Sequence, residues 1–263
     1  MNGSGGYAAK VPLIIGVNRD EGGILAPFPK SDNVTEAILA LGADAAPDKN
    51  FTGILTSGAF LPPGTYGNAT FQALNVSARV QNDGGLRCSS QATAYSGSLH
   101  SIFPAVYSYE FNRTYQPHGY SNFACNAPPT AARPNGDPDA EYLKCHAGEV
   151  TYVTGALRRW QPDRDGHDTD FARLIVDYWS SFARSSNPVP TLDWLSSRGY
   201  TSTIEQMNRV GADNTWLPVD SSNPQLRYLQ WGEGEKMVPF QDTRQCEVVG
   251  VPWDKYYEEG LAH

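Results

Sequence analysis

The segment that most restricts the possible folds of this chain is VPLIIGVN, residues Val11–Asn18. It is a continuous apolar run of strand length, which is typical of a strand buried on both faces in a parallel sheet. The polar sequence RDEGG follows it directly. Functional groups of open α/β sheets gather at the carboxyl ends of strands. Asp20 and Glu21 are therefore candidate functional residues, and the sequence alone does not separate one from the other.

The second strong pattern is an amphipathic helix that begins near Asp168 and is stopped by Asn187-Pro188. Asp168 or Thr169 can cap its first turn. Its apolar residues recur at the helical spacing i, i+3, i+4, i+7, i+8 and i+11, so they form one stripe. The residues of this stripe are Phe171, Leu174, Ile175, Tyr178, Trp179 and Phe182.

Weaker patterns predict further elements, and together they indicate the α/β class. The predicted helices are 35–41, 70–81, 91–103 and a short one in the tail 246–259. The segments 105–113 and 226–231 are rich in β-forming residues and are predicted as strands. About three strands are expected, fewer than the roughly five or six of a typical sheet. We therefore expect an incomplete, mostly parallel sheet with flanking helices.

The charge of the chain limits its partners. It has 20 basic and 28 acidic residues, a net charge of −8, and its longest basic cluster is Arg158-Arg159. Nucleic acids and anionic membranes are therefore not expected as partners. No apolar run approaches the length of about 18–20 residues that inserts stably into a bilayer. The first residues do not form a signal peptide, because no charged region precedes their short apolar run.

Six Asn-x-Ser/Thr triplets nevertheless favour a secreted glycoprotein over a cytosolic protein. None has proline in the middle, and all lie within the first 114 residues. A loop surface rich in Asn, Ser and Thr is the alternative explanation. We expect secretion, with a signal peptide that is not part of this chain. The candidate acceptors are Asn2, Asn33, Asn50, Asn68, Asn75 and Asn112.

The four cysteines are Cys88, Cys125, Cys145 and Cys246. None forms a C-x-x-C pair, and no second cysteine-histidine pair has zinc-like spacing, so a metal site is not expected. An even number of cysteines in a secreted chain predicts two disulfides. The sequence leaves three pairings open.

Among the five histidines, His146 is the strongest candidate for a catalytic base. A single histidine is more often a surface or structural residue than a catalyst. His146, however, lies near the end of the long loop 114–149, beside Cys145 and before an apolar segment. Long loops in compact domains are usually functional, and a base needs a position held to within about 3 Å of the proton that it takes. The other histidines, His100, His118, His167 and His263, lack this combination.

Five segments resemble type-B carboxylesterases, the α/β-hydrolase group of cholinesterases, fungal lipases and carboxylesterases. They follow the same order along the chain and cover essentially all of it. CHAGE, with a second cysteine upstream, is similar to the fungal branch. The segments are VPLIIGVNRDEGG (11–23), RCSSQATAYSGSLHSIFPAVYSYEFNR (87–113), KCHAGEVTYVTG (144–155), DYWSSFARSSNP (177–188) and CEVVGVPWDKYY (246–257).

The resemblance implies a serine carboxylic ester hydrolase that acts on small-molecule or lipid esters without a metal or organic cofactor. It implies that Glu21 is the acid and His146 the base of a catalytic triad, and that Glu149 is structural. It also implies a Cys88–Cys246 disulfide. Cys125–Cys145 is then the remaining pair and would anchor the loop beside His146.

The chain departs from the family pattern in its nucleophile. The family needs a serine on a G-x-S-x-G turn, and neither this motif nor a Gly-rich oxyanion loop occurs in the 263 residues. Because the family order is serine, acid, histidine, we interpret residues 1–263 as one partial α/β-hydrolase domain, the C-terminal part, whose nucleophile-bearing half is absent. Thr154, where the family usually has phenylalanine, affects the expected shape of the pocket.

Two consequences and two alternatives follow from this interpretation. The chain alone is predicted to be inactive, because a base and an acid without nucleophile or oxyanion donors lack the main sources of rate acceleration. Marginal folding and aggregation through an exposed sheet edge are also predicted. The alternatives are a non-catalytic, cholinesterase-like binding or adhesion module and a truncated gene product.

Overall fold

The centre of the molecule is a four-stranded sheet in the order β1-β2-β3-β4. A computed structural model describes residues 9–42, 51–61, 68–117, 123–211 and 214–256 of the chain. β1, β2 and β3 are parallel, and β4 runs antiparallel to β3. This confirms the predicted incomplete, mostly parallel sheet. The strands are β1 (Leu13–Asn18), β2 (Val106–Phe111), β3 (Gln225–Leu229) and β4 (Lys236–Pro239).

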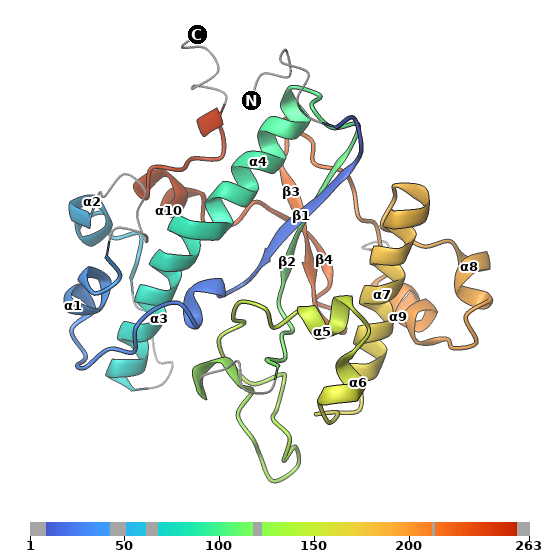
Figure 1. The fold of residues 1–263 in the computed structure, drawn as a ribbon, viewed down its shortest axis with the longest axis horizontal. Helices are drawn as coiled ribbons and strands as arrows, with labels where there is room; N and C mark the ends of the chain where they lie inside the picture. The colour runs from blue at the N-terminus through green and yellow to red at the C-terminus, as the bar shows by residue number, and fades with distance from the viewer. Residues whose placement is uncertain (1–8, 43–50, 62–67, 118–122, 212–213, 257–263) are drawn as a thin grey trace.

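Helices cover both faces of the sheet (Figure 1). On one side lie α1 (Val34–Leu39), α2 (Phe51–Thr56), α3 (Ala69–Asn82), α4 (Cys88–Leu99) and α10 (Thr243–Val248). On the other side lie α5 (Val150–Val153), α6 (Leu157–Trp160), α7 (Asp168–Ser185), α8 (Leu192–Ser196) and α9 (Ser202–Val210). A π-helical turn, Asp83–Arg87, joins α3 to α4, and 3-10 turns occur at Glu21–Gly23 and Phe123–Cys125.

The alternation of side chains along β2 divides the core between the two helical layers. Val106 packs with Ala94 of α4 in one apolar cluster. Tyr107 and Phe111 point to the opposite face and pack against α7, where Phe171 is fully buried. Complete burial of side chains of this size contributes roughly 1.5–3 kcal/mol each. The predicted stripe of α7 is therefore the face that holds this helix on the sheet.

Two strands differ from the prediction, and both lie at edges of the sheet. β1 was expected to be buried on both faces, but the four residues from Leu13 to Gly16 are only half-buried. Among the described strands, β1 pairs with β2 alone, which explains this exposure. β4 was not predicted, because the sequence KMVP is short, begins with a charge and ends in proline. These are properties of edge strands, which weaken the usual strand pattern.

Two disulfides connect elements that are distant in the sequence. Cys88 at the start of α4 is bonded to Cys246 of α10, 158 residues later. Cys125 is bonded to Cys145 across 20 residues. These are the two pairings that the family resemblance implies. A cross-link that closes a loop of the second size is worth roughly 3 kcal/mol in the chain-entropy model.

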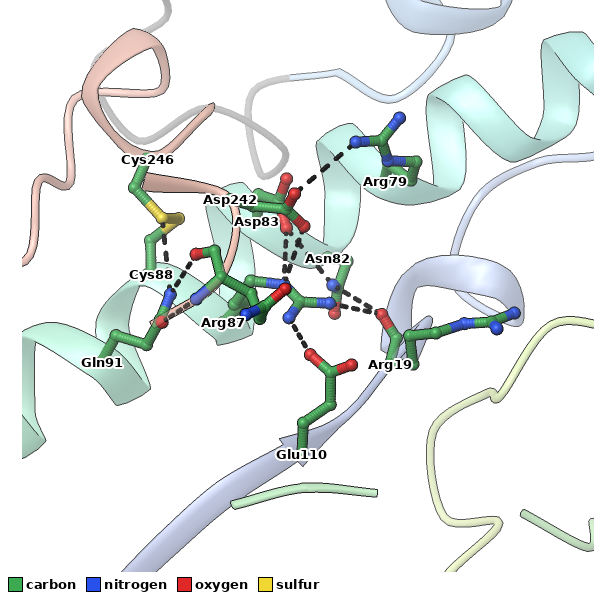
Figure 2. The surroundings of a disulfide bond; sticks show 11 residues. Arg19, Arg79, Asn82, Asp83, Arg87, Cys88, Gln91, Glu110, Asp242 and Cys246 are labelled. Atoms are coloured by element: carbon green, nitrogen blue, oxygen red, sulfur yellow. Dashed lines mark hydrogen bonds and ion pairs between the residues drawn. A yellow bond between two sulfur atoms is a disulfide. The ribbon is translucent and has the colours of Figure 1, made fainter. Parts of the chain in front are cut away.

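A buried ion cluster, which we call the Arg87 cluster, lies beside the Cys88–Cys246 disulfide (Figure 2). The Arg87 guanidinium is paired with Asp83 at 3.0 Å, with Glu110 of β2 and with Asp242 at 3.4 Å. Its Nη2 also donates to the carbonyl oxygen of Arg19 at 2.6 Å. The cluster therefore fastens the junction of α3 and α4 to the carboxyl end of the parallel strands.

Candidate active site

Glu21 is placed by the tight 3-10 turn that follows β1. Its side chain is buried, and the two glycines after it let the turn fit between neighbouring elements. A Cβ on Gly22 would lie 2.1 Å from the carbonyl oxygen of Ala78 in α3. A Cβ on Gly23 would lie 2.6 Å from Cys145 Sγ. The sequence E-G-G therefore places a carboxylate between α3 and the loop that carries His146.

His146 meets Glu21 across a separation of 125 residues. Its Nδ1 lies 2.7 Å from Glu21 Oε2. The His146 side chain is 44% exposed, whereas that of Glu21 is 8% exposed. The hydrogen bond to Glu21 raises the pKa of His146, and partial burial opposes this shift. Since Nδ1 is occupied by the carboxylate, Nε2 is the nitrogen that remains for proton transfer.

The loop around His146 is held on both sides. The Cys125–Cys145 disulfide tethers it on one side, and Gln116 Nε2 donates to the carbonyl oxygen of His146 at 3.2 Å. The next residue, Ala147, has a positive φ of 65°. This conformation is uncommon for a residue other than glycine and marks a tightly constrained turn.

The comparison with protein families matches this arrangement. The family model described as the carboxylesterase family matches residues 2–248 of the chain. The chain belongs to the carboxylesterase family. No curated protein matches it. The family supports ester hydrolysis as the chemistry and esters as the substrates, and it agrees with the predicted fold class.

In this carboxylesterase chain, the structure separates the two adjacent acids that the sequence did not. Glu21 contacts the imidazole, whereas Asp20 Oδ2 accepts the backbone N–H of Lys144 at 2.8 Å. The backbone N–H of Asp20 donates in turn to the carbonyl oxygen of Lys144 at 3.0 Å. Asp20 therefore attaches the histidine loop to the end of β1, and Glu21 is free to face the ring.

Asn18 is a site residue that sequence reasoning missed. Its backbone N–H donates to Glu21 Oε1 at 2.7 Å. Its side-chain amide donates to the carbonyl oxygen of Cys145 at 2.9 Å and to the carboxylate of Glu149. Asn18, which is 1% exposed, thus joins the acid to both ends of the His146 turn. A signal was present: Asn18 is the polar residue that ends an apolar strand.

Glu149 lies next to the pair, and among the described residues no hydrogen bond or ion pair joins it to His146. Burial raises its pKa, the hydrogen bond from Asn18 opposes this, and the charge of Glu21 adds to the increase. Its carboxylate accepts a hydrogen bond from the side-chain amide of Asn18. This agrees with the structural role that the resemblance implies.

Within the described residues, no hydrogen bond joins His146 to a hydroxyl or thiol side chain. Of the other histidines, His100 ends α4 and His167 stacks on Trp231 with ring centroids 5.5 Å apart. His118 and His263 lie outside the described residues. The structure thus brings His146 and Glu21 together and leaves His100 and His167 elsewhere.

One group of carboxylates has a spacing that could hold a metal ion. Ligand atoms of Asp163, Asp165 and Asp168 lie within 4.8 Å of one another. Arg113 forms ion pairs with Asp165 and Asp168, and Arg164 forms one with Asp168. These arginines already neutralise two of the three carboxylates. The group is therefore a set of ion pairs at the beginning of α7.

The candidate glycosylation sites differ in accessibility. Asn33 and Asn68 are exposed, and their side-chain oxygens cap α1 and α3. Asn112 is half-buried and donates to Gln230 at 2.8 Å. The side chain of Asn75 in α3 is buried, which argues against a glycan there, because oligosaccharide transfer needs an accessible amide. Asn2 and Asn50 lie outside the described residues.

The described helices also bear on membrane association. None of them combines the length and the apolar composition that a bilayer-spanning segment needs. The longest, α7, has charged residues along one side, including Asp170, Arg173 and Asp177. Its apolar side packs against the sheet.

Proposed function

We propose that this chain supplies the acid and the base of a serine carboxylic ester hydrolase, a carboxylesterase or lipase. The observation that carries the proposal is the 2.7 Å contact between His146 Nδ1 and Glu21 Oε2, from a buried carboxylate to a half-exposed ring. An imidazole held this way keeps its Nε2 lone pair directed away from the acid. This is the tautomer that a general base for a serine hydroxyl requires.

In the proposed reaction, His146 Nε2 takes the proton of the serine hydroxyl as its oxygen attacks the ester carbonyl. The protonated ring then gives this proton to the leaving alcohol, and the acyl-enzyme forms. A water molecule repeats the same two transfers and releases the carboxylic acid. Glu21 fixes the tautomer and stabilises the imidazolium, as the raised pKa of His146 supports.

The nucleophile and the oxyanion donors are proposed to come from residues outside this chain. The sequence contains no G-x-S-x-G motif. Among the described strands, the outer edge of β1 has no partner, so this edge is open to a neighbouring strand of a larger sheet. We therefore treat residues 1–263 as one partial domain that does not turn over esters alone. A retained acid-base pair disfavours the alternative of a binding or adhesion module, which needs neither residue.

Secretion and glycosylation are part of the same proposal. Two disulfides are typical of proteins that fold in an oxidising compartment. The exposed side chains of Asn33 and Asn68 support these two positions as glycan acceptors. Mass spectrometry of the protein secreted from a eukaryotic host, before and after enzymatic deglycosylation, tests both positions. A glycan found at neither would contradict this part of the proposal.

The catalytic proposal is tested with two chains. Residues 1–263, assayed with a short-chain p-nitrophenyl ester, are expected to show no turnover above buffer. A chain extended by its upstream coding sequence is expected to contain a G-x-S-x-G serine and to react covalently with a serine-directed phosphonate. His146→Gln should slow that labelling by several orders of magnitude. Turnover by residues 1–263 that His146→Ala abolishes and phosphonates do not affect would contradict the missing-nucleophile proposal.

A further inference from the structure

A pocket away from the candidate active site is lined by residues of α6, of α7 and of the segment that joins α8 to α9. These elements lie on the right-hand side of Figure 1. The volume of the pocket is about 260 Å³, and neither Glu21 nor His146 lines it. Three arginines from three different elements line it: Arg158 of α6, Arg173 of α7 and Arg198 of the α8–α9 segment. We call it the arginine pocket.

The arginine pocket contains cations without carboxylates in its lining, which is unusual for a chain of net charge −8. The cavity beside the Arg87 cluster shows the contrast. That cavity, of about 410 Å³, is lined by four cationic side chains and by four carboxylates, so its charges balance. In the arginine pocket, Asp170 and Asp177 outside the lining compensate Arg173 and Arg198, and the charge of Arg158 is left for a ligand to neutralise.

Two of the three guanidinium groups are held in place by the same aromatic ring. Arg173 and Arg198 lie 4.7 and 5.4 Å from the centroid of Tyr200. Each also has a carboxylate behind it: Asp170 accepts from Arg173 at 3.1 Å, and Asp177 lies 3.8 Å from Arg198. Stacked and backed in this way, the two groups lose little rotamer freedom when they bind an anion.

The third guanidinium has no such partner. Among the residues that the structure describes, no hydrogen bond or ion pair engages Arg158, which is exposed on α6. The adjacent Arg159 points elsewhere: it lies 5.1 Å from the ring centroid of Trp160 and does not line the pocket. Two consecutive arginines on one short helix therefore have different surroundings.

Apart from the three arginines, Thr169 and Tyr200, the lining consists of apolar side chains and one glycine. Leu157, which is 2% exposed, Ala172, and Val176 of α7 contribute to the wall of the pocket. This combination discriminates among anions. An inorganic phosphate would use the guanidinium groups alone, whereas an organic carboxylate would also cover the apolar wall. The volume lies below the roughly 300–1,000 Å³ of sites for drug-sized ligands, so the ligand must be small.

We propose that the arginine pocket binds a small organic carboxylate, with its carboxyl group against Arg158, Arg173 and Arg198 and its short hydrocarbon chain against Leu157 and Val176. Guanidinium groups recognise carboxylates through paired N–H donors. The site stands independently of the proposed hydrolase function, because it shares no residue with that machinery and its occupation is measured without turnover. It adds a ligand site to a chain whose proposed substrate lies elsewhere.

The test is a titration of the 263-residue chain with acetate, butyrate, hexanoate and inorganic phosphate at constant ionic strength and pH 7. Binding is followed by calorimetry and by the shifts of arginine side-chain NMR signals. Each added methylene that is buried should improve affinity by about two- to fourfold. We therefore expect hexanoate to bind at least tenfold more tightly than acetate. Equal affinities along the series, or phosphate binding more tightly than hexanoate, would overturn the carboxylate assignment.

Charge reversal locates the site. Arg158→Glu and Arg159→Glu change the net charge equally, at neighbouring exposed positions of the same helix, and circular dichroism verifies that both variants fold. Arg158→Glu is expected to weaken hexanoate binding at least tenfold. Arg159→Glu is expected to leave it within about twofold, as long-range charge effects alone would. Equal losses in the two variants, or no saturable binding by the unmodified chain, would overturn the proposal.

Discussion

The Glu21–His146 pair and the Arg87 cluster are both ionic, and both lie near the carboxyl ends of the parallel strands, yet they are built differently. Arg87 is 3% exposed and has three carboxylates and one carbonyl oxygen around it. Its hydrogen bonds to these groups come from Nε, Nη1 and Nη2. The side chain of His146 is 44% exposed, and its hydrogen bonds to the described part of the chain use one ring nitrogen, Nδ1.

This difference distinguishes a charge that stabilises the fold from a group that can transfer a proton. A buried cation whose three nitrogens each donate to a protein oxygen holds elements together and acts as a structural charge. A half-exposed imidazole with one occupied nitrogen keeps the other for transfer. Removing a partner from the Arg87 cluster should therefore reduce the unfolding free energy of the chain. Removing the partner of His146 should mainly change the pKa of the imidazole ring.

The largest effect is expected from Arg87→Met. Removing the guanidinium leaves the carboxylates of Asp83 and Glu110 buried without a counter-charge. Breaking a buried pair from one side costs about 3–5 kcal/mol. Urea denaturation of the 263-residue chain, followed by tryptophan fluorescence, measures this loss of unfolding free energy.

Arg133→Met is the matched control for this substitution. Arg133 also pairs with two carboxylates, Asp137 and Asp139, but on the surface of the loop. Water replaces the lost partner there, so the urea midpoint should hardly move. Equal shifts for Arg87→Met and Arg133→Met would show that burial does not distinguish the two clusters.

The sequence predicted the helices and strands whose apolar residues follow a regular pattern. The stripe of α7 identifies the helix and the face that it buries, whereas the apolar run of β1 identifies the strand but overestimates its burial. β4 escaped prediction, because four residues with a charge and a proline carry no such pattern. The disulfide pairings followed from the family resemblance and not from spacing, which left three possibilities open.

Contacts between residues far apart in the sequence were the other feature that the sequence pattern did not predict. Nothing in the spacing of the sequence relates Glu21 to His146, 125 positions later, and the family resemblance had to connect them. Asp20 and Glu21 were equivalent as neighbouring acids until the 3-10 turn directed only one of them to the ring. Asn18 was missed because its role depends on one carbonyl oxygen and one carboxylate of the 145–149 turn, which lie near it only after the chain has folded.

An intermediate effect on stability is expected from Asn18→Ala, which tests whether Asn18 positions His146 against Glu21. The substitution removes the amide that binds the Cys145 carbonyl oxygen and the Glu149 carboxylate. Leaving a buried acceptor unpaired costs about 1–3 kcal/mol. We expect a loss of that size in unfolding free energy, together with a lower pKa of His146, because the loop that presses the ring against Glu21 is loosened.

Asn112→Ala is the control for Asn18→Ala. Asn112 follows β2, and its amide donates one long-range hydrogen bond, to Gln230. It should reduce stability by a similar or smaller amount without changing the NMR titration of His146. A positioning role for Asn18 is contradicted if both variants leave that titration unchanged, whatever they do to stability.

The smallest effect on stability, and the clearest on chemistry, is expected from Glu21→Gln. The amide still accepts the Nδ1–H bond, but it no longer favours the imidazolium, so the pKa of His146 should fall. Because Glu21 raises the folded-state pKa above the ordinary 6.5, the stability that the pair contributes is fully present below about pH 6.5. It is lost as the pH rises through the folded-state pKa.

Urea denaturation at pH 5.5 and 8.5 measures how much the unfolding free energy changes between the two pH values. The gain in unfolding free energy at pH 5.5 relative to pH 8.5 should be larger in the unmodified chain than in Glu21→Gln. The excess should be below about 1 kcal/mol, because the ring is partly exposed. Glu141→Gln, which removes an exposed partner of Arg19, should leave the pKa of His146 unchanged. If instead His146 titrates identically in the unmodified chain and in Glu21→Gln, the carboxylate does not stabilise the imidazolium. The pair would then be a structural contact like those of the Arg87 cluster.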